Sequence, residues 1–137
     1  MKPYIHEVKY YECDRMGVVH HSNYIRFMEE ARIYILDELG YGFEKMEAEG
    51  IVSPVTALTA DYKKTTTFKD KIEVYVTLKE YSPLKISFNY TMKVGGAVVM
   101  RATSTHCFID TATGRPIVLG DRWPGLMEGL KDLQYDA

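Results

Sequence analysis

The chain has 137 residues, with 17 lysines and arginines against 19 aspartates and glutamates, which gives a formal net charge of −2. Its hydrophobic content of 46% and charged content of 26% are typical of a globular protein and exclude a disordered chain. The length predicts one domain over residues 1–137, and the balance of charge provides no global positive field, so we expect no nucleic-acid partner.

The N-terminal segment and the cysteines favour a cytoplasmic protein. Residues 1–10 lack the apolar stretch of a signal peptide, and no apolar run is long enough to span a bilayer. The two cysteines, Cys13 and Cys107, are too few for a secreted disulfide framework and are not spaced as CxxC. We therefore expect two reduced thiols in a cytoplasmic protein without a membrane span.

The first part of the chain predicts a strand followed by one long helix. Polar and apolar residues alternate over residues 4–10, as in a strand, and a turn follows at residues 12–17. The clearest helix covers residues 22–39, where apolar side chains fall on one side and Ser22 or Asn23 would be the N-cap. The apolar arc is wide, which indicates a helix half-wrapped by a concave surface.

From residue 51 onward the hydrophobic period changes from that of a helix to that of a strand. After a short helical piece at residues 42–50, strands are predicted at residues 51–62, 71–81, 85–94 and 97–109. Gly95-Gly96 is a two-residue hairpin signal between the last two strands. In the C-terminal tail, residues 120–137, we expect a short closing helix that begins at Pro124.

This order of elements predicts an α+β fold. One strand, one long helix and then a run of strands does not match the βαβ alternation of a parallel sheet. A long amphipathic helix and long one-sided strands fit together only if the helix lies on the concave side of the sheet. We therefore expect a curved antiparallel sheet of five to six strands wrapped around one long central helix.

One carboxylate lies where a reaction could be catalysed. Asp14 is in the turn just upstream of the long helix, where an aspartate commonly bonds its own backbone. The segment from Gly17 to Tyr24, however, leads into a helix N-terminus, whose first N–H groups have no internal partner and carry the positive end of the dipole. A carboxylate beside such a terminus is a candidate nucleophile or base next to an oxyanion site.

The other polar motifs do not predict a second reactive centre. His20 and His21 are adjacent and therefore diverge, and no further cluster has metal-ligand spacing, so we expect no metal. His6 and His106 are each isolated in predicted strands, which favours satisfied core or surface residues. No serine lies in a GxSxG elbow, and no glycine-rich segment has the lysine of a phosphate loop.

Two stretches of the sequence carry a family resemblance. Residues 10–24, YYECDRMGVVHHSNY, with FMEEAR at residues 27–32, resemble the signature of hotdog-fold acyl-CoA thioesterases. More narrowly, they resemble the 4-hydroxybenzoyl-CoA thioesterase family, including its branch associated with the Tol-Pal cluster. Residues 61–70 also match, although the family more often has proline and glycine where this chain has Thr65 and Lys69. The resemblance covers residues 4–119 and implies the hotdog fold.

The resemblance assigns catalytic roles to four residues. Asp14 matches the family's catalytic carboxylate, and His21 matches a position whose backbone N–H points at the thioester carbonyl. Gly17 and Val18 match the turn that lets the chain approach the substrate. No cofactor is implied, because coenzyme A is part of the substrate.

Five further residues are expected to bind substrate. Asn23 and Tyr24 match the start of the family's helix, where capping and core packing are alternatives to contact with the acyl chain. A chain of net negative charge needs local cations for the phosphates of coenzyme A, and Lys63, Lys64 and Lys85 lie at predicted strand ends. Solvated lysines are nevertheless the default at such positions.

The implied activity is hydrolysis of an acyl-CoA thioester to the free acid and coenzyme A. Asp14 would attack the carbonyl carbon or activate a water, and the sequence leaves both routes open. The resemblance also implies a homodimer or homotetramer with active sites at the subunit interface. The alternatives are a non-catalytic module that binds acyl-CoA or an acyl carrier, and a hotdog hydratase or dehydratase. The sequence determines neither the acyl group nor whether coenzyme A or an acyl carrier protein carries it.

Overall fold

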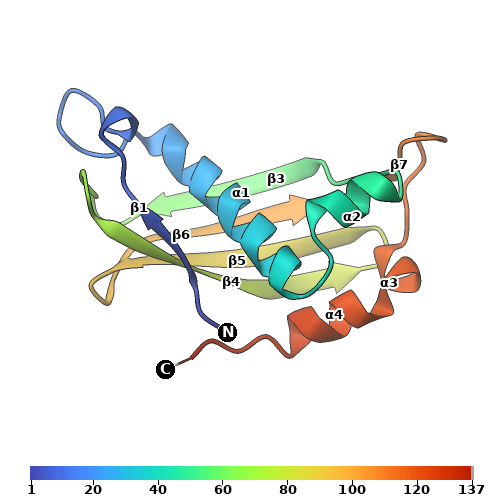
Figure 1. Cartoon of the computed structure of the whole chain (residues 1–137). Coiled ribbons are helices and arrows are strands. Elements are labelled where there is room, and N and C mark those ends of the chain that lie inside the picture. The colour runs from blue at the N-terminus through green and yellow to red at the C-terminus, as the bar shows by residue number, and fades with distance from the viewer. Residues whose placement is uncertain (137) are drawn as a thin grey trace.

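Helix α1 (His21–Glu38) lies in the concave side of an antiparallel sheet in the computed structural model, which describes residues 1–136 (Figure 1). The strands are β1 (Tyr4–Glu7), β2 (Ile51–Val52), β3 (Val55–Tyr62), β4 (Lys71–Ser82), β5 (Lys85–Val94), β6 (Ala97–His106) and β7 (Ile109–Asp110). The other helices are the 3₁₀ helix η1 (Tyr10–Glu12), α2 (Phe43–Ala48), α3 (Leu119–Arg122) and α4 (Pro124–Lys131). The predicted α+β class is confirmed.

The main sheet has five strands in the order β1-β4-β5-β6-β3, and every neighbouring pair is antiparallel. Strands β2 and β7 form a separate two-stranded ladder. The predicted hairpin between β5 and β6 is confirmed, with Gly95 and Gly96 at φ values of 56° and 82°. A type I′ turn requires this left-handed conformation at both positions, which glycine adopts without a steric penalty.

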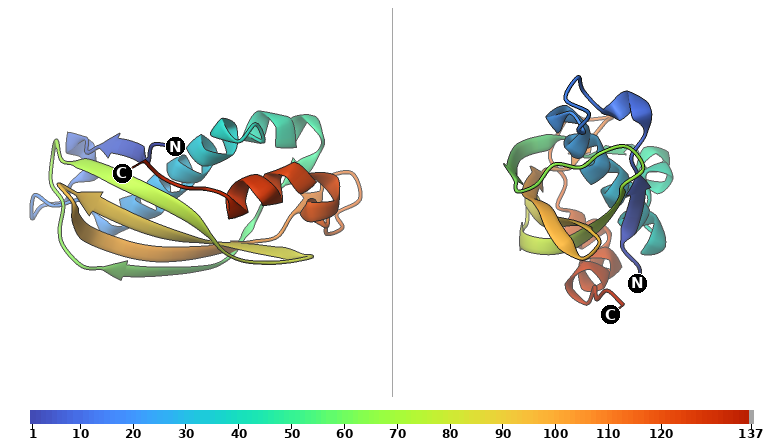
Figure 2. Two further views of the ribbon diagram at one scale, coloured as in Figure 1. Left: turned by 90° about the horizontal axis from the view of Figure 1, so that it is seen from below. Right: turned by 90° about the vertical axis from the view of Figure 1, so that its left-hand side faces the viewer.

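The sheet curls around α1 (Figure 2), and strands β4 and β5 each present a buried apolar face to the helix. On β4 and β5 the buried inward residues are Ile72, Val74, Val76, Ile86, Phe88, Tyr90 and Met92. Helix α1 buries Tyr24, Phe27, Met28, Ala31, Ile35 and Leu36 against them. The predicted faces of the helix and of these two strands are therefore confirmed, and they form one continuous hydrophobic core.

Three predicted strands are shorter than expected. Residues 51–62 divide into β2 and β3 at Pro54, because proline has no N–H to donate to a ladder. Residues 97–109 divide in the same region, where the Cys107 N–H donates to the Pro54 carbonyl at 3.3 Å. Strand β1 ends at Glu7, after which the chain turns into η1.

The predicted helix cap was wrong. His20, rather than Ser22 or Asn23, is the N-cap of α1, and its Nδ1 accepts from the Ser22 N–H at 3.2 Å. The helix begins one residue earlier than predicted, since the Val19 N–H donates to the Thr66 carbonyl at 2.8 Å and His20 is still extended. The expected C-terminal helix at Pro124 is confirmed as α4, whereas α3 was not predicted.

The two edges of the main sheet differ in how they are covered. Beyond the start of β1 at Tyr4, the Tyr135 hydroxyl accepts from the Val76 N–H of β4 at 2.8 Å and donates to the Val76 carbonyl at 2.6 Å. Strand β3 forms the opposite edge, and all its residues are exposed except the half-buried Leu58. Within residues 1–136, none of the helices is long and apolar enough to cross a bilayer.

Candidate active site

The loop that carries Asp14 is closed by its own backbone hydrogen bonds. The Asp14 N–H donates to the Val18 carbonyl at 2.8 Å, and the Gly17 N–H donates to the Asp14 carbonyl at 3.0 Å. Gly17 has a φ of 77°, in the left-handed region that glycine tolerates, so this tight turn depends on it. Cys13 and Val19 pair as an antiparallel bridge at the base of the loop.

The loop is also attached to the segment that follows β3. The Thr67 hydroxyl donates to the Gly17 carbonyl at 2.7 Å, and the Val19 N–H donates to the Thr66 carbonyl. These contacts join residues 50 and 47 positions apart in the sequence, which no local pattern predicts. They place the Asp14 loop against the end of β3.

The Asp14 side chain makes one hydrogen bond within residues 1–136. Its Oδ1 accepts from the Met16 N–H at 2.8 Å, which is the local backbone contact expected of a turn aspartate. The second carboxylate oxygen has no protein partner among the described residues. Asp14 is half-buried and lines two adjoining pockets, so its carboxylate is accessible to a ligand.

The start of α1 leaves the His21 backbone donor free within the described chain. The Ser22 N–H is bound by His20 Nδ1, and the Asn23 N–H donates to the His20 carbonyl at 2.9 Å. The His21 N–H has no such partner in residues 1–136. It therefore remains available to an acceptor, with the positive end of the helix dipole behind it.

One pocket brings Asp14 and His21 together. Its lining residues are Asp14, Met16, Val18, Val19, His21, Tyr24, Tyr62, Lys63, Lys64 and Thr65. Six residues proposed from the sequence are thus placed around one hollow, at the junction of the loop, the start of α1 and the end of β3. Four lining residues, Met16, Val19, Tyr62 and Thr65, were not predicted. Met16 and Val19 belong to the Asp14 loop itself, whereas Tyr62 and Thr65 reach the pocket only because the tertiary structure brings the end of β3 beside α1.

Aromatic rings form one wall of this pocket. The Tyr62 ring lies 5.4 Å from the Tyr24 ring and 6.3 Å from the His21 ring, measured between centroids. The Tyr62 hydroxyl donates to the His21 carbonyl at 3.1 Å, and the Tyr24 hydroxyl lies 2.6 Å from the Thr66 Oγ1. Burial raises the pKa of Tyr24, so its hydroxyl stays protonated near neutral pH.

Two of the other predicted site residues lie near this pocket without lining it. Gly17 lines the adjoining hollow, with Tyr10, Arg15 and Phe68. Asn23 is buried, and its Nδ2 donates to the Glu12 carbonyl at 2.8 Å. Its observed contact is therefore with the loop backbone, in line with the capping and packing alternative.

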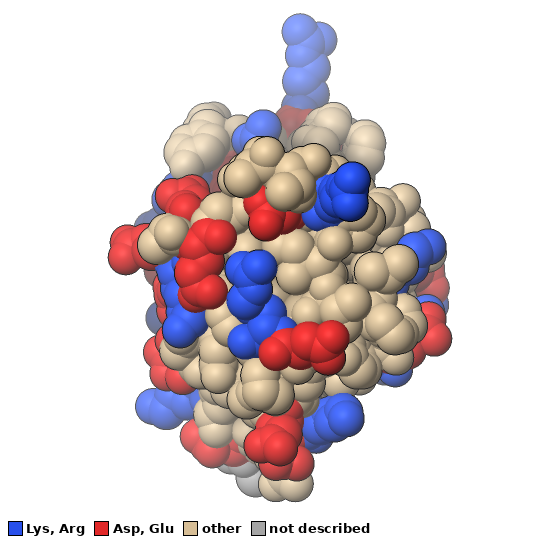
Figure 3. Space-filling view, turned by 90° about the vertical axis from the view of Figure 1, so that its right-hand side faces the viewer, with Lys and Arg blue, Asp and Glu red and all other residues tan. Residues whose placement is uncertain are grey.

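Lys85 does not lie near the pocket that Asp14 and His21 line. It pairs with Ser82 at the turn between β4 and β5, whereas β4 begins at Lys71, near the Asp14 loop. The 12 residues of β4 separate these two ends of the sheet by about 36–40 Å (Figure 1). The right-hand end of the molecule in Figure 1, seen face-on in Figure 3, shows basic and acidic side chains interspersed rather than a single basic patch.

The two lysines at the pocket differ in charge environment. Lys63 Nζ forms an ion pair with Asp61 Oδ2 at 2.6 Å, which offsets part of its charge. Lys64 has no ion pair within residues 1–136. No three histidine, cysteine, aspartate or glutamate side chains in the described part of the chain are placed to hold a metal ion.

Comparisons with known sequences give matches over most of the chain. A sequence model of the thioesterase-like superfamily matches residues 8–124. YneP of Bacillus subtilis (strain 168), provisionally named an acyl-CoA thioesterase, is 32% identical over 119 residues, which is 86% of each chain. A protein of Aquifex aeolicus (strain VF5), provisionally named an esterase, is 35% identical over 106 residues, which is 77% of this chain and 83% of its own.

Solved structures give the same result for the fold. The DHNA-CoA thioesterase of Staphylococcus aureus is similar with a TM-score of 0.86 at 32% sequence identity. The match covers 93% of this chain and 86% of the other. The similarity therefore extends over nearly the whole fold and not only over the segment around Asp14.

Proposed function

This chain belongs to the thioesterase-like superfamily and is a thioester hydrolase of the hotdog fold, and we propose that it hydrolyses an acyl-CoA to the free acid and coenzyme A. In this proposal Asp14 is the nucleophile or general base, and the His21 N–H at the start of α1 is the oxyanion donor. Val18 and Gly17 shape the turn that lets the substrate approach.

The observation that carries the proposal is that Asp14 and His21 line the same pocket. A carbonyl oxygen bound to the His21 N–H would develop negative charge at the positive end of the α1 dipole. One such donor typically contributes about 10²–10³ in rate. The free oxygen of the Asp14 carboxylate is the reactive group of this pocket, since its other oxygen is held by Met16.

Two routes are compatible with this arrangement. In the first, an Asp14 oxygen bonds to the carbonyl carbon, the C–S bond breaks with release of the thiolate, and water then hydrolyses the mixed anhydride. In the second, Asp14 takes a proton from a water whose oxygen bonds to the carbonyl carbon, and the thiolate again leaves. A single turnover with excess enzyme distinguishes them, because only the first route releases coenzyme A before the acid.

The pocket also supports an assignment of the two ends of the substrate. Tyr24, Tyr62 and His21 offer an aromatic wall to the acyl group, and Lys64 and Lys63 offer cations to the phosphates of coenzyme A. Coenzyme A is part of the substrate, so the proposed reaction requires no cofactor. We place this reaction in the cytoplasm, where free thiols such as those of Cys13 and Cys107 are stable.

We also propose a closer relationship to the 4-hydroxybenzoyl-CoA thioesterases and their Tol-Pal-associated branch, supported by the motif at residues 10–24. A panel of aromatic and aliphatic acyl-CoA substrates tests this relationship. Selective turnover of hydroxybenzoyl-CoA or short aliphatic substrates would support it, whereas exclusive turnover of naphthoyl or long-chain substrates would not.

A homodimer joined along β3 completes the proposal. The exposed edge of β3 offers unpaired backbone groups that a second copy can pair, which is otherwise a liability for aggregation. Tyr62, at the end of β3, also lines the Asp14 pocket, so a chain added at this edge would reach the active site. Light scattering coupled to size exclusion would give twice the chain mass, or four times for a tetramer, and a monomer would contradict the proposal.

The decisive experiment is Asp14→Asn assayed with acyl-CoA and a thiol reagent. We expect turnover to fall by at least about two orders of magnitude while acyl-CoA still protects the protein against melting. Asp121→Asn, an exposed change on α3, is the control and should keep wild-type turnover. Unchanged turnover in Asp14→Asn would remove Asp14 from the mechanism. Wild-type protein that is stabilised without thiol release would indicate a binding module, and an enoyl absorbance change would indicate a hydratase.

A further inference from the structure

A chain of buried polar side chains crosses the core beneath α1, and the proposed reaction does not use it. Arg32, on α1, is 9% exposed, and its Nη1 donates to the Tyr90 hydroxyl at 3.1 Å. The Tyr90 hydroxyl lies 2.6 Å from Ser104 Oγ, which in turn lies 2.7 Å from Nε2 of His106. His106 is 2% exposed.

The donor and acceptor in each of these hydrogen bonds follow from the side chains involved. Arginine can only donate, so the Tyr90 oxygen accepts and its own hydrogen goes to Ser104. Ser104 then donates to Nε2 of His106, which places the imidazole proton on Nδ1. The reverse order would leave the Tyr90 hydrogen without an acceptor among residues 1–136, and buried hydroxyls are rarely left unpaired.

Among Arg32, Tyr90, Ser104 and His106, the one positive charge is that of Arg32, and no carboxylate among the described residues forms an ion pair with it. None of the ion pairs within residues 1–136 involves Arg32. Burial, together with the nearby Arg32, lowers the pKa of His106 to about 4, and burial raises the pKa of Tyr90, so both side chains are neutral near pH 7. A buried charge without a counter-charge is costly, which makes an anion favourable beside Arg32.

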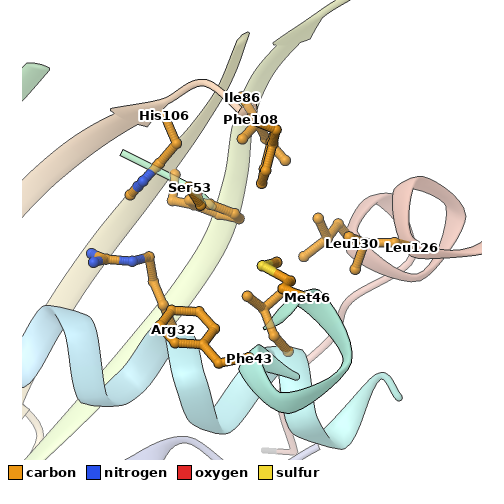
Figure 4. A pocket seen from close by; sticks show the side chains of 11 residues that line it. Arg32, Phe43, Met46, Ser53, Ile86, His106, Phe108, Leu126 and Leu130 are labelled. Carbon is orange, nitrogen blue, oxygen red and sulfur yellow. The ribbon is translucent and has the colours of Figure 1, made fainter. Parts of the chain in front are cut away.

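A small cavity lies beside these groups (Figure 4). The guanidinium of Arg32, from α1, and the imidazole of His106, from β6, extend toward one another at its polar end, with Ser53 nearby (Figure 4). The remaining lining residues are apolar: Leu36, Phe43, Met46, Ile86, Phe88, Phe108, Leu126 and Leu130. The space accommodates about one water-sized particle.

We propose that Arg32, His106 and Ser53 form a buried site for one small monovalent anion of the size of chloride. Arg32 can only donate, the neutral His106 has its one N–H at Nδ1, and the Ser53 hydroxyl can donate as well, so these lining side chains favour an occupant that accepts hydrogen bonds. A single negative charge neutralises the single charge of Arg32. The apolar walls and the small volume exclude polyatomic anions such as sulfate.

The site lies between the second half of α1, α2 and the main sheet. An anion bound there therefore stabilises the folded protein, and its binding can be measured as a higher Tm. Thermal unfolding of the whole protein is followed as sodium gluconate is replaced by sodium chloride or bromide at constant ionic strength. We expect the Tm to rise by a few degrees and to saturate as for one site, whereas sodium sulfate, which stabilises proteins by exclusion from their surface, gives a rise that does not saturate. A Tm that is the same in gluconate and halide would overturn the proposal and assign the cavity to water.

Matched variants separate this site from general salt effects. Arg32→Met should abolish the halide response, while Arg26→Met, an exposed change on the same helix, should keep it. A halide response that survives in Arg32→Met would overturn the proposal. Where Arg32→Met does not fold, the wild-type protein crystallised with bromide provides the test: an anomalous peak beside Arg32 and His106 supports the site, and its absence overturns it.

Discussion

The imidazole Nε2 of His6 lies 2.8 Å from Oε1 of Glu12, and both side chains are buried. The backbone carbonyl of Glu12 accepts from the His20 N–H at 2.9 Å and from Asn23 Nδ2 at 2.8 Å. The residue two positions before Asp14 is thus tied to β1 through its side chain and to the start of α1 through its backbone. These contacts hold the proposed nucleophile and the proposed oxyanion donor in one frame.

Glu12→Gln is expected to weaken the contacts that position Asp14 relative to the start of α1. The change removes the charge that faces His6 and lowers the free energy of unfolding by about 1–3 kcal/mol. We expect kcat to fall more than KM changes, because the position of Asp14 matters most in the transition state. Glu30→Gln is the control, since Glu30 Oε2 lies 3.3 Å from His6 Nδ1 but is 47% exposed. Equal kcat values in the two variants would show that Glu12 does not position Asp14.

His21→Pro tests the oxyanion donor directly. Proline has no N–H but is well tolerated at the first position of a helix, which His21 occupies. We expect kcat to fall by about 10²–10³ with the helix content preserved in circular dichroism. His21→Ala keeps the N–H and should remain within several-fold of the wild type. If His21→Ala lost as much activity as His21→Pro, the imidazole rather than the backbone would be the important group.

Lys69→Gly is expected to stabilise the protein. Within residues 1–136, Lys69 is the one residue other than glycine that has a positive φ, 71°. The left-handed conformation costs a residue with a side chain about 1–2 kcal/mol, and the greater entropy of glycine in the unfolded chain offsets about half of this. We expect a gain of about 0.5–1 kcal/mol, seen as a Tm higher by a few degrees. Lys71→Gly, in β4, should instead lower the Tm.

The stability of the protein should depend on His106 at acidic pH. Its pKa is about 4 in the folded state, below the ordinary value of 6.5, so the unfolded chain binds the proton first as the pH falls. The contribution of neutral His106 is therefore full above pH 6.5, is lost between pH 6.5 and 4, and changes no further below that. The measurement is Tm against pH in halide-free buffer, compared with His106→Gln. A difference between the two proteins that does not vary with pH would contradict the lowered pKa.

The local periodicity predicted the elements that carry one apolar face. Helix α1 and strands β4 and β5 have the faces that the sequence indicates, because burial against a single partner surface imposes one period on each. The breaks at Pro54 and after His106 were not predicted, although Pro54 is a visible signal. The buried Arg32 was also missed, since an arginine between apolar helix positions does not reveal which acceptors face it.

The sequence by itself determined the α+β class and the long amphipathic helix, and it indicated Asp14 as the candidate carboxylate just before the helix begins. Those features are local, or depend on the order of elements along the chain. Only the tertiary structure decided that Tyr62, Lys63 and Lys64 meet Asp14 and His21, and that Lys85 lies at the far end of the sheet. The end of β3 contacts the start of α1 through hydrogen bonds between residues far apart in sequence, such as Tyr62 to His21. A single sequence carries no periodic signal for such contacts.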